Sequence, residues 1–461
     1  MWGTVTAATA LPVLDDAELK LIDEEFAAAG VRLVLGSVVD MAGVARAKSV
    51  PAARSAAFHR SGMGASPTWN VFCIDNGIAF TSRLGVAGDL RLRADLGARR
   101  LLGDGLAWAP AEFHRQDGAL DPGCARGLLR GIQDSMPGRG LAALVGCELE
   151  FVLTHPDGTA LPASSWQAYG LGSALDAEAF LTDLAGAFEA AGLPLEQVHA
   201  EYGTGQYELS LAPAEPVAAA DRVIAARLLV GRVARRHGRA VSLSPLPFAD
   251  GAGNGAHQHL SLTHHGAPLL SGGTGPHGLT SDGAAAVAGI VAGLPDLLAV
   301  LAGSVLSGHR LQPGHWAGAY ACWGLENREA AVRLCAATPG NPHGASVELK
   351  CADPSANPYL VTAVLLGLAL DGISRQAVLP PEVPGDPTHL SPAELAQAGA
   401  VPLTAGQPET LDRLAGSPLA ERLLGPDILD ALLAVRRYEQ DHYGQQDTAG
   451  LADRFRFAWS A

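Results

Sequence analysis

Near the N-terminus, apolar and polar residues follow first a helical and then a strand periodicity. The segment Asp15–Ala29 is amphipathic, begins at acidic residues that suit a helix N-terminus and stops at Gly30, which predicts a helix. The apolar, β-branched run Val31–Asp40 and the run Val44–Val50 predict two strands joined by a turn at Met41–Gly43. We therefore expect a hairpin within a small α+β domain.

Strand-like and helix-like runs alternate along the rest of the chain. Four further strands are expected, at Leu144–Leu153, Tyr207–Leu211, Val241–Leu246 and His257–Leu262. Helices are expected at Asp176–Ala191, Val217–His237, Gly283–Ala302 and Leu419–Tyr443. The polar segment Gln116–Cys124 contains Gly and Pro and is the predicted linker. The expected limits are 15–115 for the first domain, 116–124 for the linker and 125–461 for a larger domain.

The composition is that of a folded, acidic protein. Of 461 residues, 48% are hydrophobic and 17% charged, which excludes a wholly disordered chain. At about 150 residues per domain, this length predicts two to three domains. The formal net charge is −15. Proteins that bind nucleic acid or an anionic membrane surface usually present a basic face, so we expect neither partner. A surplus of carboxylates does suit metal cations.

Two apolar runs are long enough to compare with membrane spans. Gly283–Gly303 contains Pro295 and Asp296, and Asn357–Ile373 is short and contains Asp371. Both are therefore predicted to be buried helices of a soluble protein.

The cysteines and the N-terminus indicate the compartment. Met1–Lys20 lacks a basic stretch followed by an apolar core, so we expect no secretory signal. The cysteines form no CxxC pair, which argues against a zinc ribbon or a thioredoxin motif; they are Cys73, Cys124, Cys147, Cys322, Cys335 and Cys351. Scattered cysteines in a long chain fit a reducing cytosol, so the expected location is the cytoplasm.

Paired glutamates are the first candidate chemistry. Glu148 and Glu150 are two residues apart in a predicted strand, so both point to one face, where two carboxylates among apolar residues favour a divalent cation. Glu201 and Glu208 flank Gly203–Gly205, and a turn there would form a hairpin that aims both carboxylates at one point. Each pair alone also fits an ordinary polar strand or hairpin.

A Gly-rich segment leads into the second candidate. His257, His259 and Ser261 share one face of a predicted strand, directly after the run GAGNG at 251–255. A lone histidine is more often a satisfied core residue, but this spacing after glycines indicates a ligand site. Zinc is possible, yet the surrounding acids are mostly glutamates, and oxygen-rich sites suit Mg²⁺ or Mn²⁺.

The last candidate combines an acid with cations. Glu348 and Lys350 share a strand face, and Asn357 followed by Pro358 is typical of a helix start. Three arginines suited to carboxylate or phosphate recognition, or to simple solvation, precede them: Arg310, Arg328 and Arg333. Five glutamates and a histidine can hold two or three divalent ions, which leaves positive charge for a polyphosphate. A P-loop motif is absent from the sequence.

In this order, the segments resemble the glutamine synthetase superfamily. The matching motifs are ExEF, HxE…GQxE, GNGxHxHxSL, NR…R and ELK…DPxANPYL, and they extend over nearly the whole chain, from about Val31 to Tyr443. The resemblance implies an α+β protein with an N-terminal β-grasp domain and a larger catalytic α/β domain. It also implies active sites between neighbouring subunits of stacked rings, and hence a homo-oligomer, by analogy a dodecamer.

The resemblance also implies residue roles. It places Glu150, Glu201 and Glu208 at a first metal site, and Glu148, His257 and Glu348 at a second. It places Glu196, His259, Ser261 and Arg333 at ATP, and Gly253, Arg310 and Lys350 at glutamate, with Lys350 where the family usually has Arg. Arg328 would grip phosphate as a catalytic residue. The implied substrates are glutamate, ATP and an amine, with two to three Mg²⁺ or Mn²⁺ ions per site.

Two departures bear on the amine. The flap motif of true glutamine synthetases reads roughly PGYE, but here Pro313-Gly314-His315-Trp316 puts Trp316 at the glutamate position. The ammonium-binding Asp of a DGSS-like motif is replaced by Gly64. Both anionic partners of ammonium are therefore missing, so Trp316 and Gly64 are expected to line a pocket for an organic amine, with Trp316 a candidate catalytic residue.

The departures predict a γ-glutamyl-amine ligase. The stretch Val38–Pro51 resembles the VDxxGVxRxKxVP of such enzymes, and Ser346 stands where the family often has a phosphate-binding Arg. A small organic amine is favoured over a long polyamine, which would want carboxylates along its entry channel. The alternatives are an ammonia-using glutamine synthetase and a non-catalytic member of the family.

Overall fold

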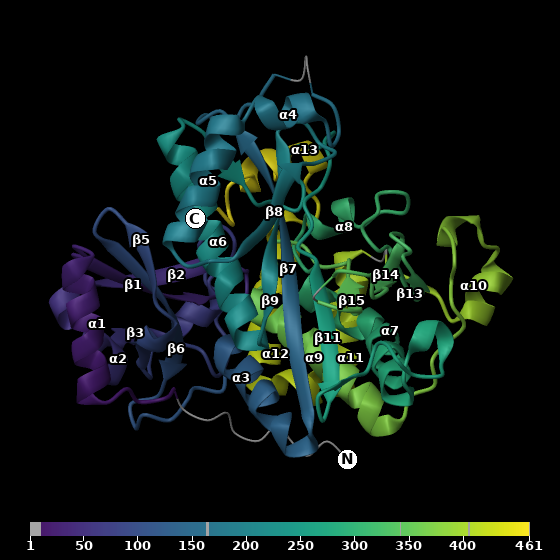
Figure 1. Ribbon diagram of the computed structural model, residues 1–461, viewed down its shortest axis with the longest axis horizontal. Coiled ribbons are helices and arrows are strands. Elements are labelled where there is room, and N and C mark those ends of the chain that lie inside the picture. Colours follow the sequence, from purple (N-terminus) through teal and green to yellow (C-terminus); the bar gives the residue numbers. More distant parts are fainter. Residues whose placement is uncertain (1–10, 163–165, 342, 404–405, 461) are drawn as a thin grey trace.

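The protein is described by a computed structural model that covers residues 11–162, 166–341, 343–403 and 406–460. Its strands form two sheets, one from residues 33–114 and one from residues 141–402. In Figure 1 the smaller sheet lies to one side, and the long strands of the larger sheet run through the centre. The predicted linker 116–124 falls between the two in sequence, while the domain limits themselves stay a prediction.

The smaller sheet begins with the predicted helix and hairpin. Helix α1 (Asp16–Ala28) starts at Asp15, whose side chain accepts from the Glu18 N–H while the Glu18 side chain returns to the Asp15 N–H, a capping box. Strands β1 (Leu33–Val39) and β2 (Ala45–Pro51) pair antiparallel, as predicted. The sheet order is β2-β1-β6-β4-β3, with β5 beside β6; the other strands are β3 (Met63–Ala65), β4 (Leu90–Ala94), β5 (Arg100–Gly103) and β6 (Leu106–His114).

The larger sheet carries the candidate chemistry. Its order is β16-β13-β14-β15-β11-β7-β9-β8, with β10 beside β7 and β12 beside β11. The strands that matter most below are β7 (Leu141–Thr154), β8 (Leu195–Ala200), β9 (Gln206–Ala214), β11 (Gln258–His264), β14 (Ala330–Cys335) and β15 (Ser346–Leu349). The remaining ones are β10 (Ala240–Ser242), β12 (Ala267–Pro268), β13 (Tyr320–Leu325) and β16 (Val401–Pro402). Strands β8 and β9 pair antiparallel, so the predicted hairpin is present.

Helices pack around both sheets (Figure 1). The α-helices after α1 are α2 (Ser55–Arg60), α3 (Ala125–Ser135), α4 (Leu171–Leu175), α5 (Glu178–Ala190), α6 (Pro216–Arg236), α7 (Ser281–Leu301), α8 (Ser307–Arg310), α9 (Pro358–Arg375), α10 (Pro392–Ala398), α11 (Gln407–Gly416), α12 (Pro418–Tyr443) and α13 (Thr448–Phe455). Short 3-10 turns include η2 (Pro67–Val71) and η3 (Leu96–Ala98). As predicted, Asn357 caps α9: its side chain accepts from the N–H groups of Tyr359 and Leu360.

The two apolar helices, α7 and α9, lie in the core. By length and composition alone each could cross a membrane, but 78% and 83% of their most apolar windows are buried inside the protein. They pack against each other, as the core helices of soluble proteins do. This agrees with their expected role as buried helices.

One expected strand is shorter than predicted. The run Val241–Leu246 forms a strand only as far as Ser242. Beyond it, the Asn254 side-chain amide donates to the carbonyl oxygens of Ser242 and Ser244, and the Asn254 N–H donates to that of Pro245. These bonds take the place of a strand partner, so an apolar pattern alone overestimates this strand.

Candidate active site

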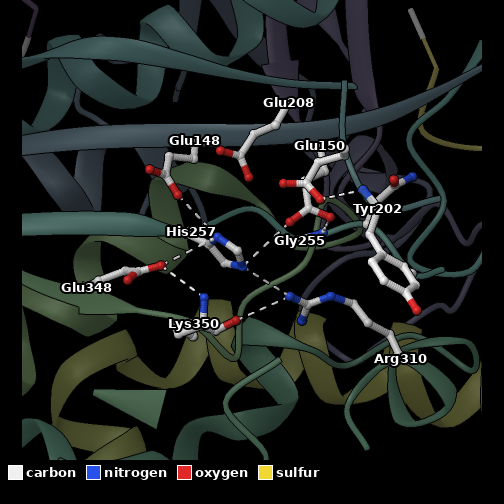
Figure 2. A network of polar contacts seen from close by, with 12 residues as sticks. Glu148, Glu150, Tyr202, Glu208, Gly255, His257, Arg310, Glu348 and Lys350 are labelled. Carbon is white, nitrogen blue, oxygen red and sulfur yellow. Dashed lines mark hydrogen bonds and ion pairs between the residues drawn. The ribbon is translucent and has the colours of Figure 1, made fainter. Parts of the chain in front are cut away.

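Two strands place glutamates face to face inside the larger sheet. Glu148 and Glu150 lie on one face of β7, as predicted, and Glu150 is paired directly opposite Glu208 of β9. Figure 2 shows these carboxylates pointing toward a common region. Like charges directly opposite each other destabilise a sheet. The fold therefore accepts a cost here that a bound cation would remove.

His257 completes one group of possible ligands, from the segment just before β11. Its Nδ1 lies 3.2 Å from Glu148 Oε2 and 3.6 Å from Glu348 Oε1. Gly255 makes room for it, because a Cβ there would lie 2.4 Å from His257 Nε2. Ligand atoms of Glu148, His257 and Glu348 lie within 4.8 Å of one another. The structure thus brings together the second metal set expected from the sequence.

The first expected metal set, Glu150, Glu201 and Glu208, is divided between two groups. Glu150 and Glu208 group with His257, whereas Glu201 and Glu208 group with His199, again with ligand atoms within 4.8 Å. His199 of β8 is paired opposite Glu208, and its Nε2 lies 3.3 Å from Glu201 Oε1. Glu208 is common to both groups and thus links the two predicted partners.

The charges of these groups indicate what they bind. Burial raises the pKa of Glu208 well above its usual range, and the carboxylates of Glu148, Glu150 and Glu201 add to the rise. Burial alone would raise the pKa of Glu148 too, but its contacts with two imidazoles hold that pKa well below the usual range. Clustered carboxylate oxygens with an imidazole are the donor set of Mg²⁺ or Mn²⁺ sites. The residues present therefore fit divalent cations.

Cationic side chains lie beside the same carboxylates and His257. Lys350 Nζ donates to Glu348 Oε1 at 3.1 Å, and Arg333 donates to Glu348 Oε2 at 3.0 Å. The Arg310 guanidinium lies 3.3 Å from both His257 Nε2 and the Lys350 carbonyl oxygen (Figure 2). Lys350, predicted to bind glutamate, is thus bonded to Glu348, a predicted metal ligand. This contact links the cationic side chains to the carboxylate groups.

The residues expected at ATP divide into two pairs by their contacts. His259 Nδ1 lies 3.2 Å from Ser346 Oγ, and its Nε2 lies 3.3 Å from Glu148 Oε1. Ser261 donates to the Ala345 carbonyl oxygen, and the Glu196 carboxylate lies 3.0 Å from a nitrogen of His343. Of the four residues expected at ATP, His259 and Arg333 therefore contact metal ligands, whereas Ser261 and Glu196 contact the segment 343–345.

The remaining predicted residues lie in loops near the site or, for Gly64, in the other sheet. Gly253 is packed so closely that a Cβ would lie 2.6 Å from Arg310 Cγ, which requires glycine there. Trp316 is 54% exposed on the loop 312–318, and the Arg328 side chain is exposed. Gly64 lies on β3 of the smaller sheet with open space at its Cβ position. Within this one chain Gly64 belongs to a different sheet from the metal ligands.

Four residues near the site were not predicted from the sequence. Tyr169 stacks on His199 with ring centroids 6.1 Å apart, and burial together with Glu201 raises its pKa. The Gln206 amide lies 3.1 Å from Glu150 Oε2, and Glu329 accepts from the Trp316 N–H at 3.0 Å. His199 had a signal in the sequence, since it lies two residues before Glu201 and shares its face in an extended chain. Tyr169 and Glu329 had none.

Comparisons with known proteins place this geometry in a family. Residues 122–450 match the family model described as the glutamine synthetase catalytic domain. A gamma-glutamylpolyamine synthetase of Streptomyces coelicolor is 39% identical over 94% of this chain and 95% of its own length. A glutamine synthetase of Methanosarcina mazei is 29% identical over 77% of this chain and 81% of its own.

Solved structures agree with the sequence comparisons. A structure titled as a novel glutamine synthase homolog superposes with a TM-score of 0.83 at 33% identity, over 93% of this chain and 99% of that one. A GmaS/ADP complex superposes with a TM-score of 0.80 at 25% identity, over 92% and 96%. The resemblance predicted from the motifs is confirmed: the chain belongs to the glutamine synthetase family and is an ATP-dependent ligase.

Proposed function

We propose that the protein activates the γ-carboxylate of glutamate with ATP, as an acyl phosphate, and couples it to an organic amine. The observation that carries the choice of amine is Trp316, an exposed indole where ammonium-using relatives are expected to have a glutamate. An indole N–H only donates, so it cannot accept a proton from ammonium, but its face suits an alkyl chain or a cationic amine. The relative at 39% identity, named for a polyamine product, supports the same branch.

The proposed size of the amine is wider than the sequence alone predicts. The sequence favours a small amine over a long polyamine. The Streptomyces coelicolor relative is named as a gamma-glutamylpolyamine synthetase and is similar over nearly the full length of both chains. We therefore propose both polyamines and short alkylamines as substrates.

The proposed residue roles follow the groups described above. Glu148, His257 and Glu348 would hold one divalent cation. Glu150, Glu201 and Glu208 would hold a second, joined through Glu208, which belongs to both of the other groups, with two to three Mg²⁺ or Mn²⁺ ions in all. When bound, these ions would offset the charge of the phosphates and the carboxylates. Glu196, His259, Ser261 and Arg333 would bind ATP; Gly253, Arg310 and Lys350 glutamate; Arg328 the transferring phosphate; and Trp316 with Gly64 the amine.

Four broader features belong to the same proposal. The smaller sheet would be a β-grasp domain, with limits 15–115, followed by the linker 116–124 and the catalytic domain 125–461. Subunits would assemble as stacked rings, so that Gly64 of one subunit approaches Trp316 of the next. That assembly would explain why these two residues lie apart within one chain. The proposed location is the cytoplasm.

The test is ADP release with glutamate, ATP and Mg²⁺ across a panel of ammonium, ethanolamine, short alkylamines, aromatic amines and polyamines, with the product identified by mass spectrometry. We expect the highest kcat/KM with an organic amine and a γ-glutamyl amide as product. Highest turnover with ammonium would instead identify an ammonia-using glutamine synthetase. ATP binding without ADP release for any amine would identify a non-catalytic member.

A paired variant sharpens this test. Trp316→Glu combined with Gly64→Asp restores both acidic groups, so we expect the ratio of ammonium to organic-amine activity to rise about tenfold or more. Gly64 has open space at its Cβ position, so a side chain can begin there without a clash within the chain. An unchanged ratio would show that these two positions do not select the amine.

A further inference from the structure

Glu329 is a buried carboxylate that none of the predicted roles uses. It lies directly before β14 and is 6% exposed. Oε1 accepts from the Trp316 N–H at 3.0 Å, whereas Oε2 is buried and has no hydrogen-bond partner among the described residues. A buried carboxylate oxygen without a donor is costly, since it has lost water and gained nothing. Single buried oxygens of Glu112, Asp353, Asp430 and Glu439 also have no partner among the described residues, but the other oxygen of Glu329 holds the loop that carries Trp316.

The register of β14 and β15 shows which residues beside Glu329 face the active site. Arg333 is paired opposite Glu348, and the Lys350 N–H donates to the Ala331 carbonyl oxygen. Because side chains alternate along a strand, Ala331 and Arg333 share the face that carries Glu348. Glu329 lies in the turn just before β14 and is placed by its contact with the Trp316 loop, which packs against Ala331 and Lys350 of this face.

The loop that carries Trp316 closes over this part of the face. Gly318 packs so tightly that a Cβ would lie 2.9 Å from both Ala331 Cα and Lys350 Cβ. Gly314, Trp316 and Gly318 all have positive φ, with a value of 51° at Trp316, a conformation that a bulky residue adopts only when its surroundings hold it. The hydrogen bond to Glu329 is one such constraint, and it leaves the indole exposed.

Glu329 is itself fixed in place. Its N–H donates to Asn327 Oδ1 at 3.0 Å, and the Asn327 amide donates to the carbonyl oxygens of Val383 and Gly385. Arg333 and Lys350, which flank this part of the face, both pair with Glu348. The Glu329 side chain is thus held against the backbone of the residue that carries the exposed indole, and among the described residues no lysine or arginine lies within ion-pair distance of it.

We propose that Glu329 is a specificity-determining residue for the amine: Oε2 accepts a hydrogen bond from the substrate's amine nitrogen, while Oε1 holds Trp316 so that its indole covers the attached carbon chain. This inference rests on the proposed function. It supplies a fixed acceptor for an alkylammonium group at a site whose loop carries an indole in place of a carboxylate. The chemistry it recognises is a primary amine on an apolar chain.

The test compares Glu329→Gln with wild type in steady-state kinetics. An amide has a single acceptor oxygen, so the variant keeps one of the two contacts and loses the charge at nearly the same size. We expect the KM of the preferred amine to rise about tenfold or more, because a charge-assisted hydrogen bond is lost. The KM values of ATP and glutamate should stay within about twofold, which a general loss of structure would not allow.

Glu382→Gln is the matched control. Glu382 Oε1 also accepts a backbone N–H, from Leu325 at 2.9 Å, but it pairs with His277 away from the predicted site residues. It should leave all three KM values unchanged. Glu329→Leu removes both contacts, so it should lower kcat as well, and the thermal midpoints of all variants establish that each is folded.

The outcomes separate the inference from the proposed function. A wild-type enzyme that makes a γ-glutamyl amide, with Glu329→Gln leaving the amine KM within twofold or raising all three KM values alike, overturns the inference alone. A wild-type enzyme that forms only glutamine overturns the proposed function, and the inference with it. A selective rise in the amine KM supports both.

Discussion

Two buried clusters of carboxylates lie in this protein, and they differ in how their charge is balanced. One lies where the smaller sheet meets helices α3 and α6, and joins Asp95, Glu112 and Asp221 to arginines. The other is the pair Glu150 and Glu208 with its neighbours in the larger sheet. We call the first the junction cluster and the second the metal cluster.

The carboxylates of the junction cluster are paired with arginines of the chain itself. Arg126 of α3 donates to Asp221 and Glu112 at 2.9 Å and to Asp95 at 2.8 Å, and it is 4% exposed. Arg130 also donates to Glu112, and the Tyr359 hydroxyl donates to Asp221. Every carboxylate here has a fixed cationic partner, so the cluster connects the two halves of the fold without a ligand.

The metal cluster lacks such partners. Within 4.0 Å, Glu150 and Glu208 form ion pairs only with histidines among the described residues, at 3.9 Å to His257 and 4.0 Å to His199. A buried charge without a partner is unfavourable, and removing such a group relieves the fold instead of weakening it. The comparison teaches that burial alone does not separate a structural cluster from a binding site, whereas the identity of the counter-charges does.

The largest expected effect is on the junction cluster. Arg126→Met leaves the buried Glu112 and Asp221 and the partly buried Asp95 without their main cation, so we expect a loss of about 5 kcal/mol in stability toward urea. Arg422→Met is the matched control, because Arg422 pairs with Asp371 at 42% side-chain exposure and should cost less than about 1 kcal/mol. Equal losses for the two variants would contradict a structural role for the junction.

The metal cluster should respond in activity and not in stability. Glu150→Ala removes a proposed ligand that faces Glu208, so ADP release should fall about a thousandfold. In a chelator, its urea midpoint should be no lower than that of wild type, since the change removes repulsion. Glu189→Ala, the same substitution at an exposed position of α5, should change neither quantity. A large loss of stability with activity retained would reverse the assignment of the two clusters.

Asp40 is an intermediate case, a fully buried carboxylate with one arginine. It accepts from Arg46 Nε at 2.8 Å, yet burial raises its pKa from 3.8 to about 6. The folded state therefore keeps the proton over a range where the unfolded state has lost it, and stability falls as pH rises from about 4 to about 6. The change from 3.8 to about 6 corresponds to about 3 kcal/mol.

Urea unfolding of wild type and Asp40→Asn from pH 4 to pH 7 checks this. The wild type should lose about 3 kcal/mol relative to the variant over this range, because asparagine does not titrate. A difference that stays flat with pH would mean that Arg46 compensates the buried charge fully, as Arg126 does at the junction.

The same contrast explains what the sequence could predict. The two-residue spacing of Glu148 and Glu150 was enough to predict that they share a strand face. The glycines at 203 and 205 predicted the hairpin that brings Glu201 and Glu208 close. These features depend on period-two alternation and local turn chemistry. His199 was missed because its contact with Glu208 depends on the register between β8 and β9, which one strand's pattern does not contain.

Contacts between distant segments were beyond prediction for the same reason. The bond from Trp316 to Glu329 requires the loop 312–318 to fold back on β14. Lys350 was correctly placed on the face of Glu348, but its partner depends on side-chain reach across the assembled site. The family resemblance implies roles for the matching motifs. It does not say which residues contact Trp316 and Gly64, the two positions that depart from it, because those contacts depend on the folded chain.

The smallest expected effect tests whether a cation completes the metal cluster. A cation that binds only the folded state at 100 times its dissociation constant stabilises that state by about 2.7 kcal/mol. Wild type in Mn²⁺ or Mg²⁺ should therefore melt at a higher temperature than in chelator. Glu208→Gln should lose most of this increase, because Glu208 belongs to both groups of ligands that lie around it.

Arg126→Met makes this measurement decisive. The variant should melt at a lower temperature than wild type under all conditions, yet keep the full increase on adding the cation, since the junction cluster lies outside the proposed metal ligands. Glu208→Gln should show the opposite behaviour, with undiminished stability in chelator and little response to the cation, because burial among like charges already disfavours the ionised carboxylate. If the cation stabilised Glu208→Gln as much as wild type, the cation would bind elsewhere, and the proposed division between an arginine-paired junction and a cation-dependent site would be wrong.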